Sequence, residues 1–194
     1  MDQLEFSGVI IDNSGSTPSV GARQTIWDGD RAESIDMAVI SSTKVVVICN
    51  PSDTSHVEMR TMSISGNTIT EQTVETVETI NGLNCRMAMI SGGTGLVAYR
   101  NASGSAHRLC RFTISGDTVS AGTPQTHGTD TVARPMGMCK LDGSRVFYVY
   151  HNSTNDIYVQ VIDISSGISE GTPQRIGTRD VDFTGTHVQS CLRS

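Results

Sequence analysis

Basic and aromatic residues are both scarce in this sequence. Lys and Arg together number 14 among 194 residues, against 20 acidic residues, so the formal net charge is −6. Proteins that bind nucleic acid usually carry a clustered basic surface, and the sequence shows no basic block, so we expect no nucleic-acid partner. Aromatic residues make up only 5% of the chain, with Trp27 as the single tryptophan.

Long apolar segments are also missing. No stretch approaches the roughly 18 apolar residues that a membrane-spanning helix needs, so we expect no membrane partner. The first residues, MDQLEFSGVIIDNSG, lack the basic start and apolar core of a signal peptide. We therefore predict synthesis in a reducing cytoplasm. The five cysteines form no CxxC pair and mostly lie in apolar runs, which predicts buried free thiols rather than a disulfide framework.

Small polar residues make up much of the composition that is neither charged nor hydrophobic. Hydrophobic residues account for 37% of the chain and charged residues for 18%. Low hydrophobicity without high charge does not indicate disorder. A chain rich in Ser, Thr, Gly and Asn is instead typical of many short strands joined by tight turns.

A repeat of about 50 residues runs through the chain. Its anchors Ile64, Ile114 and Ile164 are spaced by 50 and 50 residues. Around and after them lie the related segments MSISGNTITEQTVET (62–76), FTISGDTVSAGTPQT (112–126) and IDISSGISEGTPQR (162–175), with a weaker copy, IDNSGSTPSVGARQT (11–25). Two further shared runs precede each anchor, so each unit is predicted to contain four short strands.

Four strands per unit and this period are typical of a β-propeller blade. We therefore predict an all-β, β-propeller-like fold with about four blades of four-stranded antiparallel sheet, forming a single domain over 1–194. The units are predicted at about 27–79, 80–130 and 131–180, and the last blade is split between 1–26 and 181–194.

The split blade lacks a counterpart of the second strand. Three explanations stay open: a blade of three strands, completion by other chains in a homo-oligomer, or a chain that is part of a longer repeat protein. Pairing of the two ends would protect strand edges that are otherwise exposed.

The runs Leu96–Asn101 and Ile114–Pro124, with their copies in neighbouring units, resemble a repeat of bacteriophage and environmental-virus structural proteins. Propeller-type repeats of phage tail and fibre proteins are similar. The resemblance covers about 27–180. It implies a non-enzymatic structural component of the virus particle, in capsid decoration or in a tail or fibre, which is located in the virion and contacts other virion proteins.

Neither the resemblance nor the residue pattern supplies catalytic residues. The sequence contains no GxSxG elbow and no Gly-rich phosphate loop before a helix. Its five histidines do not follow a metal-ligand spacing. We therefore predict that the protein is not an enzyme and uses no cofactor or metal.

A carbohydrate-binding adhesin that recognises a host-surface glycan is the alternative function, and an intracellular interaction scaffold is a third. Tyr99 and Tyr150 recur at equivalent positions, followed two residues later by Asn101 and Asn152. Together with Trp27 they are the candidate ligand-binding residues. A tyrosine in the second strand can equally be buried, with its hydroxyl bonded locally.

Overall fold

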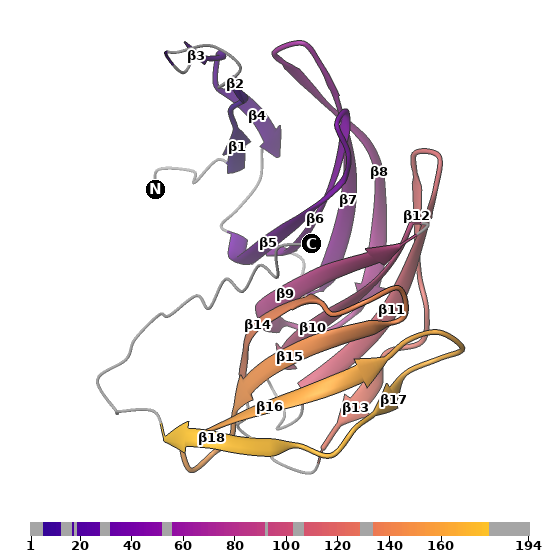
Figure 1. Ribbon diagram of the computed structural model, residues 1–194. Helices are drawn as coiled ribbons and strands as arrows, with labels where there is room; N and C mark the ends of the chain where they lie inside the picture. Colours follow the sequence, from indigo (N-terminus) through magenta and orange to yellow (C-terminus); the bar gives the residue numbers. More distant parts are fainter. Residues whose placement is uncertain are drawn as a thin grey trace.

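The computed structural model describes residues 6–12, 17, 19–27, 32–51, 56–91, 93–102, 107–128 and 134–178. Every regular element within these residues is a β-strand, which confirms the predicted all-β class. The strands form three large antiparallel sheets and two short N-terminal strand pairs (Figure 1).

Each large sheet is built mainly from strands that pair in chain order. The first sheet contains β5 (Ala32–Ser41), β6 (Lys44–Pro51), β7 (Val57–Ser65) and β8 (Thr68–Glu78). The second contains β9 (Gly82–Ser91), β10 (Thr94–Asn101), β11 (His107–Ser115), β12 (Thr118–Ala121) and β13 (Gln125–His127). The third contains β14 (Arg134–Lys140), β15 (Arg145–His151), β16 (Asp156–Asp163), β17 (Ser169–Glu170) and β18 (Gln174–Thr178).

The remaining strands form what we call the N-terminal unit. In it β1 (Phe6–Gly8) pairs with β4 (Gln24–Trp27), and β2 (Ile11–Asp12) pairs with β3 (Ser19–Val20). Figure 1 shows this unit at one end of the molecule and the third sheet at the other.

Glycine and proline determine how the outer strands are connected. Gly66 and Gly116 have φ of 56° and 60° in the β7–β8 and β11–β12 turns, a left-handed conformation that glycine adopts without steric penalty. Pro124 and Pro173 each follow a Gly-Thr pair, and neither has a backbone N–H that could donate to a neighbouring strand. The outer strand is therefore divided, so β12 and β13 both pair with β11, and β17 and β18 both pair with β16.

The three sheets stack face to face, and the second is buried on both sides. Along β10, Val97 and Tyr99 belong to the core shared with the first sheet, whereas Leu96 and Ala98 belong to the core shared with the third. A strand covered on both faces needs a continuous apolar run, which explains the sequence LVAY.

The inner strands of the three sheets lie next to one another, with β9 between β5 and β14. Polar side chains connect them across the sheet boundaries. The N–H of Met87 donates to Asp36 Oδ2 at 2.8 Å, and Arg86 Nε donates to the carbonyl of Met136 at 2.9 Å. The same order of strands thus repeats from sheet to sheet.

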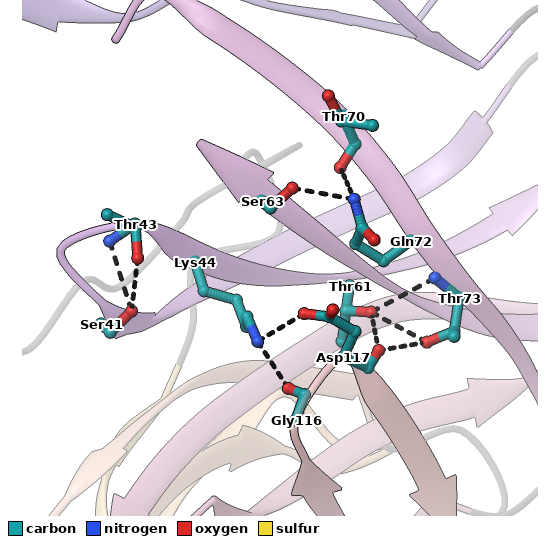
Figure 2. Close-up of polar contacts among 10 residues, drawn as sticks. All are labelled: Ser41, Thr43, Lys44, Thr61, Ser63, Thr70, Gln72, Thr73, Gly116 and Asp117. Atoms are coloured by element: carbon teal, nitrogen blue, oxygen red, sulfur yellow. Dashed lines mark hydrogen bonds and ion pairs between the residues drawn. The ribbon is translucent and has the colours of Figure 1, made fainter. Parts of the chain in front are cut away.

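The β11–β12 turn attaches the second sheet to the outer part of the first (Figure 2). Lys44 Nζ donates to the carbonyl of Gly116 at 2.6 Å and pairs with Asp117 Oδ1 at 2.5 Å. The hydroxyls of Thr61 and Thr73 both donate to the carbonyl of Asp117, at 2.5 and 2.6 Å. Of these groups Thr61 is fully buried, so its hydroxyl needs a partner within the protein.

Candidate functional site

Tyr99 lies between the first and second sheets, fully buried. Its hydroxyl donates to Glu78 Oε2 at 2.8 Å, and Arg108 binds the same carboxylate through Nε at 3.0 Å and Nη2 at 2.5 Å. Burial, and secondarily Glu78, raise the pKa of the Tyr99 phenol above its usual range. This is the locally bonded arrangement that the sequence left open; a role of Tyr99 in ligand binding stays a prediction.

Tyr150 belongs to a buried cluster of tyrosine and histidine rings between the second and third sheets. The rings of His107 and His127 stack, with centroids 5.6 Å apart, and Tyr150 lies edge-on to them at 5.4 and 5.0 Å. His107 Nδ1 lies 3.1 Å from the Tyr148 hydroxyl, and His127 Nδ1 lies 2.7 Å from Glu170 Oε2. Sequence reasoning missed this cluster, in which His107 on β11 pairs with His127 on β13.

The other candidate residues have separate positions. Asn152 Oδ1 accepts hydrogen bonds from the Thr154 N–H at 3.1 Å and the Asp156 N–H at 2.8 Å, which shapes the β15–β16 turn. Asn101 ends β10 and is half-buried. Trp27 ends β4, and its side chain lies outside what the structure describes. The two candidate tyrosines belong to different cores, so they do not form one shared surface.

A pocket of about 290 Å³ opens between the second and third sheets, and we call it the inter-sheet pocket. Its walls come from β11, β12, the β12–β13 link, β13 and the β16–β17 turn. The side chains that matter for its chemistry are Arg111, Thr113, Ser120, Thr123, Gln125 and Ile168. Arg111 Nε donates to the carbonyl of Ile164 at 3.0 Å, which fixes this side chain at the boundary.

One of the hairpins that line the inter-sheet pocket is shorter than its copy. In the β11–β12 hairpin Phe112 pairs with Ala121, a separation of 121 − 112 = 9, whereas in the β16–β17 hairpin Ile162 pairs with Glu170, a separation of 170 − 162 = 8. The longer hairpin brings Asp117 against the first sheet. The shorter one has one residue fewer to fill the corresponding space against the second sheet.

A second candidate surface begins in the N-terminal unit, which is built like the outer part of the large sheets. The same backbone hydrogen bond, 2.8 Å long, fixes the strand crossing in three units: Gly21 N–H to Ile10, Gly122 N–H to Arg111, and Gly171 N–H to Val161. The N-terminal unit therefore corresponds, residue by residue, to the third and fourth strands of a repeat.

This correspondence identifies an uncovered apolar surface. Ile11, which pairs with Val20, occupies the position of Phe112 and Ile162. Phe112 and Ile162 are 1% and 0% exposed because each packs against the preceding sheet, whereas Ile11 and Val20 are 61% and 67% exposed. Among the residues that the structure describes, no sheet therefore packs on the N-terminal unit where one precedes the equivalent residues of the other units.

The inner strand of the first sheet shows the same contrast. Met37 pairs with Val47 as Met87 pairs with Val97, so the two methionines are equivalent. Met87 is 4% exposed and belongs to the core shared with the first sheet, whereas Met37 is 68% exposed. We call Ile11, Val20 and Met37 the leading surface, because a sheet precedes the equivalent residues in the other units.

Cysteine and metal chemistry give no further site. Cys49, Cys85, Cys110 and Cys139 are buried free thiols, as predicted, and Cys191 lies outside the described residues. Burial raises the pKa of Cys85 to about 12. Within the described part of the chain, no group of three or more His, Cys, Asp or Glu could hold a metal ion, and no helix is long and apolar enough to cross a membrane.

No protein-family model matches the chain, and no curated protein matches it significantly.

Proposed function

We propose that the sheets are blades of a β-propeller-like arrangement of about four units, with the fourth formed by residues 1–26 of one copy and 181–194 of a second copy. The adjacency of β5, β9 and β14 supports this, because the first strands of propeller blades lie around a common axis. The recurring hydrogen bond in the N-terminal unit supports it too. Residues 181–194 lie outside the described part of the chain.

The leading surface needs a sheet to cover it, and the third sheet has the matching repeat pattern. Leu96 in the second sheet is fully buried against the third sheet, and the equivalent Phe147 in the third sheet is partly exposed. Within one chain the N-terminal unit and the third sheet lie at opposite ends of the molecule (Figure 1). The third sheet of a second copy is therefore the proposed cover, in a head-to-tail contact.

On this basis the protein acts as a non-enzymatic structural component of a virus particle, through contacts with copies of itself and with other virion proteins. The observation that carries the proposal is the exposure of Ile11, whose equivalents are buried in every complete unit. Apolar surfaces of this kind mark sites of protein association. The resemblance of the repeats to those of virus structural proteins supports the placement in a particle.

Cross-linking tests the head-to-tail contact. In the proposed assembly, residues 181–194 follow the third sheet of one copy onto the leading surface of the next. Met37→Cys with the native Cys191 should then give covalent dimers with a short bismaleimide. Val74→Cys is the matched control, because Val74 is exposed on β8, the outer strand of the same sheet. Cross-links within single chains, or equal yields from both variants, would contradict the contact.

Immunogold labelling tests the placement in a virus particle. An antibody against this chain should label particles purified from its source. Label on the shell indicates capsid decoration, and label at tail or fibre tips indicates host attachment. Absence of label from every particle would refute the virion role without affecting the cross-linking result.

A further inference from the structure

The inter-sheet pocket occupies a position that is filled by an oxygen-rich turn at the other sheet boundary. There, the carbonyl of Asp117 accepts hydrogen bonds from Thr61 and Thr73, and its carboxylate pairs with Lys44 (Figure 2). By the repeat spacing, Arg111 and Thr123 are the equivalents of Thr61 and Thr73. The repeat thus places hydrogen-bond donors at this position in both sheets. In the pocket, the donors Arg111 and Thr123 face the shorter β16–β17 turn.

The lining of the pocket suits one negative charge and several hydroxyl groups. Among the residues that the structure describes, Arg111 is the only charged one that lines it, and a guanidinium binds carboxylates strongly. The hydroxyls of Thr113, Ser120 and Thr123 both donate and accept hydrogen bonds, and the Gln125 amide does the same through its two ends.

Apolar contacts complete the lining. Ile168 lines the pocket beside the polar groups and packs against the core shared by the second and third sheets, and it provides carbon surface for the face of a sugar ring. With a volume of about 290 Å³, the pocket lies just below the usual range for ligand sites, which begins at about 300 Å³. It therefore suits one ring rather than an extended chain.

From these features we infer that the inter-sheet pocket binds a hexuronate, that is, a sugar ring with one carboxylate. The carboxylate lies at Arg111, the ring hydroxyls at Thr123 and Gln125, and a ring face on Ile168. This inference goes beyond the structural role proposed above and does not depend on self-association. It gives the alternative of glycan recognition a defined location, at a place that none of the candidate residues Tyr99, Tyr150 or Trp27 occupies.

Binding of D-glucuronate, followed by NMR chemical-shift titration of the full chain, tests the inference. We expect saturable shifts for residues of the pocket, and binding at least about tenfold weaker for D-glucose, which lacks the charge-assisted bonds. Equal binding of the two sugars, or no binding of glucuronate, would overturn the proposal.

Variants taken from the repeat itself separate binding from folding. The first unit has Glu75 where the second has Gln125, so Gln125→Glu introduces a negative charge at a position that already accepts glutamate. It should weaken glucuronate binding about tenfold or more. Gln174→Glu makes the same change at the equivalent place in the third unit, outside the pocket, and should leave binding unchanged.

A third variant refills the pocket. Insertion of one Asp between Ser166 and Gly167 gives the β16–β17 hairpin the length of its copy and should abolish binding while the circular dichroism spectrum stays unchanged. If this insertion or Gln125→Glu binds glucuronate as tightly as the native protein, the ligand site lies elsewhere and the proposal is wrong.

Discussion

Substitution of Tyr99 tests how the first and second sheets are held together. Tyr99→Phe removes the hydroxyl that donates to Glu78 at 2.8 Å. Hydrogen bonds to charged groups contribute up to about 3 kcal/mol, and because Glu78 and Arg108 are each 21% exposed the expected loss of unfolding free energy is about 1–2 kcal/mol. Tyr99→Ala also removes a fully buried ring, which typically costs about 3–5 kcal/mol.

Urea unfolding followed by circular dichroism measures both losses on one scale. Val74→Ala serves as the control, since Val74 is exposed and its loss should stay within about 0.5 kcal/mol. A loss below about 1 kcal/mol for Tyr99→Ala would refute the packing of Tyr99 between two sheets. Equal losses for the phenylalanine and alanine variants would mean that the ring itself contributes nothing.

Three further outcomes follow from the packing. Gly95→Ala should destabilise the protein by roughly 1–3 kcal/mol in the same urea assay, because an added Cβ would lie 2.4 Å from Phe112 Cζ. Cys85 and Cys110 are buried and have pKa values raised to about 12, so mass spectrometry should find them alkylated at pH 8 only after unfolding. Burial raises the pKa of the Tyr148 phenol well above 10. The stability that the buried neutral phenol contributes is therefore complete below about pH 10 and is lost as pH rises further. In an alkaline titration, the absorbance of tyrosinate at 295 nm and the unfolding of the protein should change together.

The repeat made the fold class predictable, because its pattern is local. A continuous apolar run such as LVAY is typical of a strand buried on both faces, and β10 is such a strand. The division of the outer strands was not foreseen, although Pro124 and Pro173 mark it in the sequence. The stacking of the sheets depends on contacts between units, such as that of Lys44 with Asp117, and no single segment encodes these contacts.

The candidate site was less predictable, for a physical reason. Recurrence selected Tyr99 and Tyr150, but recurrence also follows from a shared packing role, and both residues are buried. The inter-sheet pocket lies instead at a place where the copies differ in length. The spacing from Ile114 to Ile164 is 164 − 114 = 50, and that from Gly122 to Gly171 is 171 − 122 = 49. The difference of one residue between these two spacings was the signal in the sequence that pointed to the pocket.

The central claim is that an uncovered repeat surface assembles copies of the chain head to tail. Sedimentation equilibrium tests it most directly, with the native protein and Ile11→Asp at equal concentration. The account predicts a mass that is a multiple of 20.7 kDa and rises with concentration for the native protein, and a monomer for the variant. A native protein that stays at 20.7 kDa at all concentrations, or a variant that assembles equally well, would contradict it.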